Sequence, residues 1–166
     1  MKYREATRDD VSRIMQIIRQ AQAQMRALGS TQWQDNYPAV SDIEHDIAYG
    51  YGIVACDSTS VIGYAAMLFN GEPAYANIEG AWLSTGDYVV VHRLAIADEV
   101  KRRGTATAFM RHVEEVARQH NCGSFRIDTA HDNLYMQRMV ATLGFSLCGK
   151  VWYTSGMRLA YEKLLK

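Results

Sequence analysis

The chain has 166 residues, which is the usual length of one globular domain, and we expect a single domain over residues 1–166. Hydrophobic residues make up 48% of it and only 2 residues are proline, so a disordered or fibrous chain is excluded. The 18 Lys and Arg residues balance the 18 Asp and Glu residues, so no overall field attracts nucleic acid or an anionic membrane. Any anion site must therefore be local.

The number of cysteines and the residues at the start of the chain indicate the cellular compartment. The 3 cysteines form no C-x-x-C pair, and an odd number argues against a secreted fold held by disulfides. The opening residues are charged where a signal peptide needs an apolar stretch, and no run is long enough for a membrane span. We therefore expect a cytoplasmic protein.

A strand and a helix are expected first. The strand lies near residues 2–7, and Thr7 is a suitable N-cap for a helix. The apolar residues that follow recur at helical spacing until Gly29 ends the pattern. Residues 29–38 then form a long polar loop that contains two large aromatic side chains.

A short second helix and a group of strands come next. Ser41 and Glu44 predict a capping box at the start of this helix. Four β-rich runs separated by turn residues then suggest an antiparallel meander: residues 51–56, 61–69, 75–83 and 88–96.

The C-terminal part alternates helix and strand. Apolar spacing predicts a helix over Thr105–His120, a strand over residues 124–129 and a further helix that ends at Gly144. Two closing strands fit residues 145–153 and 157–164. The pattern predicts an α+β fold with about four helices and a mixed central sheet of six or seven strands.

The most informative segment is a strand that leads into a basic loop at the start of a helix. The strand Val91–Ile96 is followed, after an acidic turn, by the loop Lys101–Thr107. The first turn of a helix has backbone N–H groups without internal partners, so this loop suits a phosphate. The glycine patterns of dinucleotide folds and of Walker A loops are both absent. The alternative is a solvated basic turn.

At these residues the chain resembles the GNAT superfamily of acyl-CoA-dependent N-acyltransferases. The family signature is Arg or Gln, two residues, Gly, one residue, then Gly or Ala, and the segment Lys101–Ala106 matches it except for its lysine. A Leu94-Ala95-Ile96 strand precedes the signature, and Asn133 stands eleven residues before Gly144. The resemblance follows nearly the whole chain in element order, and it implies the GNAT fold with splayed central parallel strands.

The resemblance also implies acetyl-CoA as co-substrate and assigns residues to it. The backbone of Leu94, Ala95 and Ile96 would pair with the pantetheine arm as a missing strand would. The Asn133 side chain would bind the arm near the sulfur. The pyrophosphate would be wrapped by Lys101, Arg102, Arg103, Gly104, Thr105, Ala106 and Thr107. Lysine at the signature's first position keeps a donor but loses the planar fork of arginine.

The acceptor amine must lose a proton, because an alkylamine with a pKa of about 10.4 is almost wholly protonated at neutral pH. Glu79 and His92 are the candidate proton acceptors near the predicted acyl end. His92 stands two positions before Leu94, which predicts that both lie on one strand face. Alternatively, Glu79 lies on the outer face of a strand, and His92 is a core histidine bonded to a backbone carbonyl.

A dedicated general acid is not expected. Family members often place a tyrosine seven residues after the helix asparagine to protonate the leaving thiolate, and this position is Val140. Val140 falls on the apolar stripe of its helix, which indicates packing. Tyr135 is the nearest replacement along the chain, with exposure or packing as its alternative roles.

Three aromatic residues are candidates for the wall of the acceptor pocket, with ordinary core packing as the alternative: Trp33, Tyr37 and Trp82. Cys122 and Cys148 lack a histidine placed in sequence to form a thiolate, so direct attack is favoured over an acyl-cysteine. No set of residues has metal-ligand spacing, and we expect no metal.

The sequence therefore predicts an enzyme that moves an acetyl group from acetyl-CoA to a primary amine by direct attack in a ternary complex. The expected partner is an amine-bearing small molecule or peptide, with no nucleic acid and no membrane, and a homodimer is left open. Two alternatives remain, because a fold does not determine a function. One is a regulatory module that holds acyl-CoA without turnover, and the other is an unrelated α+β binding domain with a fortuitous loop.

Overall fold

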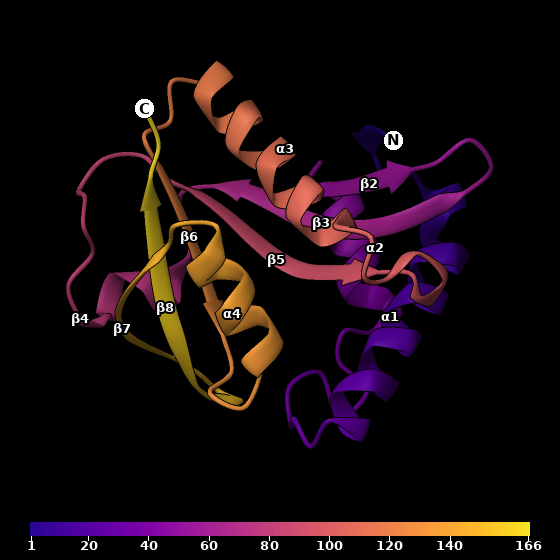
Figure 1. Cartoon of the computed structure of the whole chain (residues 1–166), viewed down its shortest axis with the longest axis horizontal. Helices are drawn as coiled ribbons and strands as arrows, with labels where there is room; N and C mark the ends of the chain where they lie inside the picture. The colour runs from indigo at the N-terminus through magenta and orange to yellow at the C-terminus, as the bar shows by residue number, and fades with distance from the viewer. The chain divides into compact units, whose positions relative to one another are not determined.

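The computed structural model describes all 166 residues and has an α+β fold with four α-helices (Figure 1). Its eight strands form one mixed sheet in the order β1-β2-β3-β5-β6-β8-β7-β4. The predicted fold class and helix number are confirmed, and the strand number is slightly higher than the expected six or seven. The chain divides into two compact units, residues 1–67 with 91–109 and residues 68–90 with 110–166.

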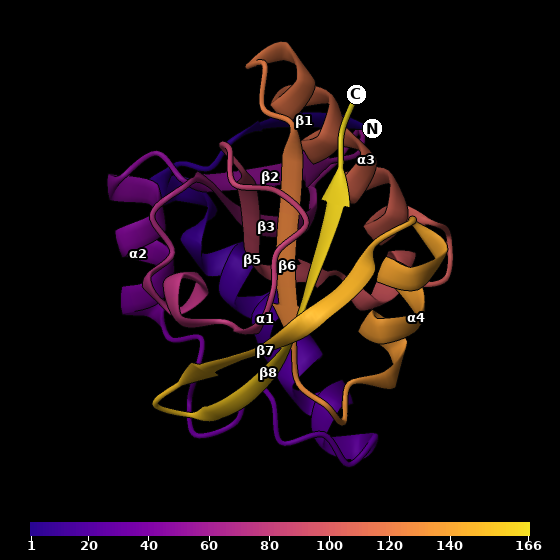
Figure 2. The ribbon, with the colours of Figure 1, turned by 90° about the vertical axis from the view of Figure 1, so that its left-hand side faces the viewer.

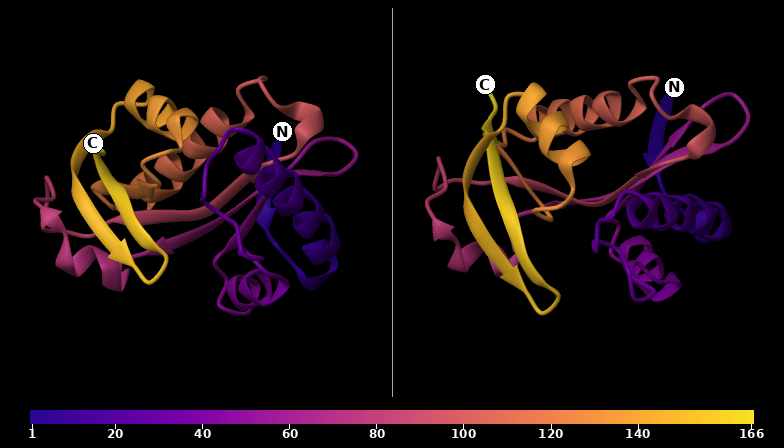
Figure 3. Two further views of the ribbon diagram at one scale, coloured as in Figure 1. Left: turned by 90° about the horizontal axis from the view of Figure 1, so that it is seen from below. Right: turned by 60° about the horizontal axis from the view of Figure 1, so that its bottom comes forward.

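The first unit combines antiparallel strands with two helices. Strands β1, β2 and β3 pair antiparallel in sequence order. Helices α1 and α2 lie side by side on one face of these strands (Figure 3), and their buried isoleucines supply much of the core. The elements that lie wholly in this unit are β1 (Lys2–Glu5), η1 (Arg8–Asp10), α1 (Val11–Ala27), α2 (Val40–Ala48), β2 (Gly52–Cys56) and η3 (Asp98–Val100). Three elements are shared with the second unit: β3 (Val61–Phe69), β5 (Val89–Ile96) and α3 (Thr105–Gln119).

Helix α2 begins differently from the prediction. It starts at Val40, and the N–H of Ala39 donates to the Asp42 carboxylate at 2.8 Å. The predicted capping box of Ser41 and Glu44 is therefore wrong, because the acidic residue that reaches back to the cap lies two positions earlier. None of the four helices is long and apolar enough to cross a membrane.

The second unit is built on a β-hairpin. Strand β8 pairs antiparallel with β7 on one side and with β6 on the other. Helix α4 and the turn η2 lie on opposite faces of β6 and β8 (Figure 2). The elements are η2 (Pro73–Asn77), β4 (Glu79–Gly80), β6 (Ser124–Thr129), α4 (Leu134–Thr142), β7 (Ser146–Tyr153) and β8 (Gly156–Leu164), with the ends of β3, β5 and α3.

The predicted strand over residues 75–83 is wrong for most of its length. Pro73 begins a 3-10 turn, where its fixed φ is favourable, and only Glu79–Gly80 is extended. This short strand pairs with β7, so the meander does not continue through it. Gly80 faces Gly149 so closely that a Cβ on either residue would collide with the opposite backbone. The β-rich composition of the segment reflects packing of its side chains, which does not require a strand.

Within the second unit, the start of β5 pairs in parallel with β6. Val89 pairs with Phe125, and Val90 pairs with Arg126. The sheet is therefore mixed, because β6 also pairs antiparallel with β8.

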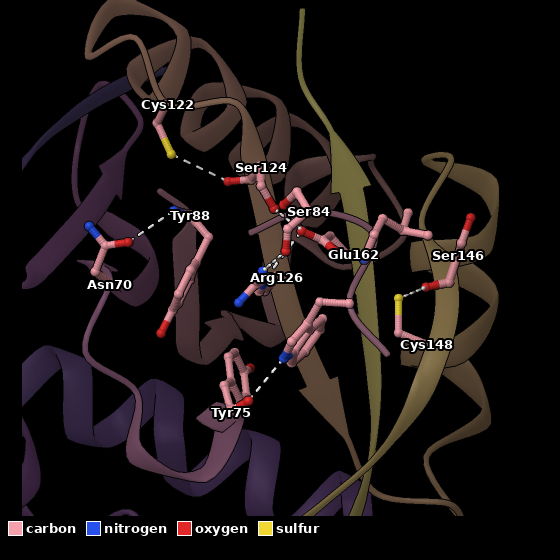
Figure 4. Close-up of polar contacts among 12 residues, drawn as sticks. Asn70, Tyr75, Ser84, Tyr88, Cys122, Ser124, Arg126, Ser146, Cys148 and Glu162 are labelled. Atoms are coloured by element: carbon pink, nitrogen blue, oxygen red, sulfur yellow. Dashed lines mark hydrogen bonds and ion pairs between the residues drawn. The ribbon is translucent and has the colours of Figure 1, made fainter. Parts of the chain in front are cut away.

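A fully buried carboxylate ties the loop before β5 to the sheet of the second unit. Glu162 of β8 accepts hydrogen bonds from the Leu83 N–H at 2.5 Å and from the Ser84 hydroxyl at 2.6 Å (Figure 4). It also accepts from the Ser124 hydroxyl and, at 3.1 Å, from Nε of Arg126. The charge is thus neutralised and its oxygens are satisfied, which a buried carboxylate requires.

Arg126 extends this network to the aromatic side chains of the same unit. Its Nη2 donates to the Ser84 carbonyl at 2.7 Å. Its guanidinium carbon lies 4.4 Å from the ring centre of Trp82 and 4.2 Å from that of Tyr88. Stacking on two rings is typical of a desolvated arginine. The loop that carries Trp82 is therefore held in place by one buried ion pair.

We expect Glu162→Gln to destabilise the protein by about 3–5 kcal/mol at neutral pH, because it leaves the buried Arg126 without its charge partner. Urea unfolding followed by circular dichroism measures the change. Glu115→Gln on α3 is the control, since this carboxylate is 60% exposed and its removal should change stability by less than about 0.5 kcal/mol.

The same pair predicts a pH dependence. Burial alone would raise the pKa of Glu162, but the hydrogen bonds from Ser124, Ser84, Leu83 and Arg126 lower it below its usual value. The resulting stabilisation is complete above the unfolded pKa of about 4.3 and is lost as the pH falls through the folded pKa. The Glu162→Gln variant should lack this contribution. An unchanged dependence of unfolding free energy on pH below 4 would contradict the assignment.

Candidate active site

The predicted phosphate loop lies in the first unit and has the expected backbone. Helix α3 begins at Thr105, and its first helical bond runs from the Ala108 N–H to the Gly104 carbonyl at 2.9 Å. The N–H groups of Thr105, Ala106 and Thr107 donate to no acceptor in the chain. Gly104 has a φ of +76°, which favours glycine, and the space beside its Cα is open. Three donors at the positive end of a helix can therefore face an anion.

The three basic side chains of this loop differ in their surroundings. Arg102 and Arg103 are exposed and form no ion pair. Lys101 is less exposed, since its ammonium group pairs with Asp98 at 2.7 Å and also donates to Gln24. The two arginines are thus the cations with no carboxylate partner, and the lysine at the first signature position is already neutralised.

The predicted pantetheine strand precedes this loop in the same unit. Leu94 and Ile96 are half-buried and Ala95 is buried. Just beyond them, the Ala97 N–H donates to the Ile62 carbonyl at 2.9 Å, on the edge toward β3. The resemblance to the family puts the pantetheine arm along this segment, since an extended amide chain can pair with open backbone groups of a strand.

His92 is half-buried on β5, and its neighbour changes the course of the strand. Arg93 has a φ of +57°, which is rare for a residue other than glycine. The regular alternation of side chains therefore stops at Arg93. The inference that His92 and Leu94 share one strand face, which assumed unbroken alternation, loses its basis.

A buried ion pair holds Arg93 in this conformation. Its Nε and Nη2 donate to the two oxygens of Asp46, at 2.8 and 2.5 Å, and Asp46 is fully buried. The Tyr64 hydroxyl also donates to Asp46 at 2.6 Å, and burial with the Asp46 charge raises the pKa of Tyr64. The Nη1 of Arg93 donates to the Tyr37 hydroxyl at 3.0 Å. This bidentate pair links α2, β3, β5 and the loop before α2.

Asp46 was not predicted from the sequence. The sequence feature that indicates its burial is its position three residues after Ile43 on a short amphipathic helix, because both residues lie on the buried face. Its partner Arg93 is 47 residues away, and no local pattern indicates that distance.

The aromatic candidates have different environments. Trp33 is buried, which favours packing, whereas Tyr37 is 42% exposed. Both lie in the first unit. Trp82 belongs to the second unit, where its indole N–H donates to the Tyr75 carbonyl at 2.9 Å and its ring stacks on Arg126.

Glu79 and Asn133 also belong to the second unit. Glu79 is exposed on β4, opposite Lys150 of β7, in the position expected for the outer face of a strand. The Asn133 side chain accepts the Met136 N–H at 3.1 Å and so caps α4. The structure thus gives Asn133 a local role besides the one implied by the family.

The remaining candidates differ in their exposure to solvent. Val140 is fully buried, as its apolar stripe indicates, and Tyr135 is 63% exposed. The Cys122 thiol is buried and donates to the Ser124 carbonyl at 3.4 Å (Figure 4). Burial and the Glu162 charge raise the pKa of Cys148, so its thiol stays protonated at neutral pH. No group of three or more His, Cys, Asp or Glu side chains is placed to hold a metal ion.

Comparisons with known proteins identify the family of the chain. The acetyltransferase (GNAT) family model matches residues 14–145. A GNAT-family acetyltransferase from Streptococcus agalactiae 2603 has a solved structure that is 36% identical, covers 99% of this chain and 95% of its own, and has a TM-score of 0.90. No curated protein matches the chain.

Two more distant structures share the fold alone. One is a GNAT-family acetyltransferase from Listeria monocytogenes 4b F2365, at 19% identity over 99% of this chain and 94% of that one, with a TM-score of 0.77. The other is an aminoglycoside 6'-N-acetyltransferase from Acinetobacter haemolyticus, at 20% identity over 92% and 96%, with a TM-score of 0.68. The match of the family model to most of the residues, together with the Streptococcus structure, shows that the chain belongs to the GNAT acetyltransferase family.

Proposed function

We propose that the protein transfers an acetyl group from acetyl-CoA to a primary amine by direct attack in a ternary complex. The amine nitrogen forms a bond to the thioester carbonyl carbon, the carbon–sulfur bond breaks, and CoA leaves as a thiolate. Holding amine and thioester side by side supplies most of the rate enhancement, because it removes the entropic cost of their encounter.

The observation that carries this proposal is the loop Lys101–Thr107. Three N–H groups without acceptors and two arginines without carboxylate partners occur within the six residues from Arg102 to Thr107. CoA carries several negative charges, and bonds from charged donors to phosphate are among the stronger ones in proteins. The backbone edge of Leu94–Ile96 is proposed to pair with the pantetheine arm, and Asn133 to bind the arm near the sulfur.

The acceptor side is proposed to use Glu79 or His92 as proton acceptor, through a water molecule, and Trp33, Tyr37 or Trp82 as walls. The acceptor is a small molecule or peptide with a primary amine. The raised pKa of Cys148 and the buried thiol of Cys122 favour direct attack over an acyl-cysteine. We place the protein in the cytoplasm and treat residues 1–166 as one functional domain.

The decisive experiment measures thiol release from acetyl-CoA across a broad panel of amines, together with calorimetric binding of acetyl-CoA. Thiol release that depends on the amine supports the transferase. Binding without thiol release for any amine supports a regulatory module that holds acyl-CoA, and the absence of binding supports an unrelated binding domain.

We expect Gly104→Glu to weaken acetyl-CoA binding by at least about tenfold, or 1.4 kcal/mol, because it adds bulk and negative charge where the phosphates bind. Gly104→Asn is the matched control, since asparagine tolerates the positive φ and adds no charge. Isothermal titration calorimetry measures both. Unchanged affinity in Gly104→Glu would show that the phosphates bind elsewhere.

Loss of the proton acceptor should lower the rate at neutral pH more than at alkaline pH, where the amine is already deprotonated. We therefore expect Glu79→Gln or His92→Ala to move the pH profile of kcat/KM toward higher pH. If both variants keep the wild-type rate and profile, the amine loses its proton to solvent and neither residue is the base.

We expect Tyr135→Phe to reduce kcat by less than about tenfold. The conjugate thiol has a pKa near 8.5, so the thiolate is a tolerable leaving group without a general acid. A general acid would raise the rate by a factor of about 10², the lower end of its usual range. Steady-state kinetics with saturating acetyl-CoA measures the effect. A loss of three orders of magnitude with intact CoA binding would identify Tyr135 as the acid.

A further inference from the structure

One side of helix α1 contacts the turn η3, which leads into the loop Lys101–Thr107. The Gln20 side-chain oxygen accepts the Asp98 N–H at 3.0 Å. The Arg13 guanidinium pairs with Glu99 at 2.8 Å. Because Arg13 and Gln20 are two helical turns apart, both contacts come from the same side of the helix. The turn before the phosphate loop is therefore fixed to α1 by two side chains.

Lys101 adds a third contact with the same helix. Its ammonium group donates to the side-chain oxygen of Gln24, which lies one turn beyond Gln20 on this side of α1. The same ammonium group pairs with Asp98 at 2.7 Å. The lysine side chain is thus directed back toward the helix and the turn, and its charge is balanced by a carboxylate.

The backbone changes direction directly after Lys101. Arg102 has a φ of +63°, a left-handed conformation that is unfavourable for a residue with a side chain. Gly104 has a φ of +76°, and the N–H groups of Thr105–Thr107 that have no acceptor follow it. Such a backbone persists only when the surrounding structure holds it in place. The contact of Lys101 with Gln24 fixes the start of this segment to α1.

The three cations of the loop differ in their availability to a ligand. The side chains of Arg102 and Arg103 are exposed and form no ion pair, so both are available to an anion. Lys101 is half-buried, and its ammonium group would have to leave both Asp98 and Gln24 to bind a phosphate. Because this charge already has a carboxylate partner, the exchange gains less than binding of a phosphate by an unpaired arginine.

We propose that Lys101 is a positioning residue that fixes the phosphate loop to helix α1 through Gln24, while Arg102 and Arg103 bind the phosphates. The inference rests on the proposed binding of acetyl-CoA at this loop. A loop that is held in its binding conformation before the ligand arrives loses less conformational entropy on binding. Gln24 is uncharged and lies outside the loop, and it therefore contributes to the affinity for acetyl-CoA through Lys101.

Replacement of Gln24 distinguishes the two possible roles of Lys101. If Lys101 positions the loop, Gln24→Ala weakens acetyl-CoA binding by at least about threefold, because a hydrogen bond to a charged group is lost. If Lys101 binds a phosphate, the same variant frees its ammonium group, and the affinity stays equal or rises. Alanine is the most favourable residue in a helix, so α1 is retained. Isothermal titration calorimetry measures the affinity, and an equal or higher value in Gln24→Ala would overturn the proposal.

Gln22→Ala is the matched control on the same helix. Gln22 donates to the Tyr37 carbonyl at 2.8 Å and to the Pro38 carbonyl at 3.4 Å, and both belong to a different loop. This variant should change the affinity for acetyl-CoA by less than about twofold. A loss equal to that in Gln24→Ala would show that the helix acts through its general stability, which would contradict the inference.

A double-mutant cycle tests whether Gln24 acts through Lys101. Lys101→Met removes the ammonium group and should weaken acetyl-CoA binding. We expect Gln24→Ala to cause no further loss in this variant, because both changes remove the same link. A further loss as large as the one in the wild-type background would show that Gln24 acts by another route, and the proposal would be wrong.

Salt dependence identifies the residues that meet the phosphates, because ionic strength screens the attraction between exposed charges. Arg102→Gln and Arg103→Gln should each weaken acetyl-CoA binding and reduce its decline from low to high salt. Gln24→Ala should weaken binding by the same factor at every salt concentration, which the loss of a phosphate contact would not do. Arginine variants that bind acetyl-CoA as the wild-type protein does would contradict the assignment of the phosphates to these side chains.

Backbone order in the ligand-free protein separates this inference from the proposed function. NMR order parameters of the Arg102, Arg103 and Gly104 amides should fall in Gln24→Ala and stay unchanged in Gln22→Ala. If they fall in Gln24→Ala but the wild-type protein does not bind acetyl-CoA, the proposed function is wrong and the link to α1 stands. If the wild-type protein binds acetyl-CoA but Gln24→Ala changes neither the order parameters nor the affinity, the proposed function stands and the link is wrong.

Discussion

The open first turn of helix α3 is the constraint on which the candidate site depends. Gly104 has a φ of +76°, and the N–H groups of Thr105, Ala106 and Thr107 donate to no acceptor in the chain. A side chain that capped these N–H groups would satisfy them within the protein, and none would remain for an anionic ligand. Because the first turn is left open, a phosphate group can use it. The strand segment Leu94–Ile96 precedes this loop, so one stretch of chain carries both segments proposed to bind the cofactor.

Each unit uses a fully buried carboxylate to fix the segments that carry candidate residues. In the first unit, Asp46 holds Arg93 and thereby the irregular turn of β5 next to His92. In the second, Glu162 holds Arg126 and the loop of Trp82. Such pairs contribute little net stability compared with apolar packing, but breaking either one leaves a buried charge. Their effect is to allow one arrangement of otherwise irregular segments.

Local patterns were sufficient for much of this fold. The helical spacing of apolar residues located three of the four helices, and the basic loop with Gly104 located the start of α3, because these features depend on neighbours in the chain. The second helix was predicted from a capping pattern, whose residues were assigned wrongly. The segment 75–83 was misread, because Tyr75 is apolar and β-prone but packs from a 3-10 turn that Pro73 begins. The family signature also gave no indication that Lys101 is paired with Asp98.

The side chains that link distant segments were beyond sequence reasoning. Arg93 and Asp46 are 47 residues apart, and Arg126 and Glu162 are 36 apart. The Tyr75 and Tyr153 hydroxyls likewise donate to Asp128 of β6, which is 53 and 25 residues away. No periodicity connects such positions, because hydrogen bonds between side chains are determined by the packed structure.

The left-handed backbone of Arg93 restricts which sequences this fold can accept. A left-handed residue with a side chain costs about 1–2 kcal/mol, and here the bidentate bond to Asp46 offsets it. Glycine would relieve the backbone but leave Asp46 buried and unpaired, whereas lysine would keep the charge but lose the fork. Single substitutions at either position are therefore unfavourable. The two residues can be replaced only together. A related sequence that loses the pair by one substitution at a time would therefore pass through a less stable single variant.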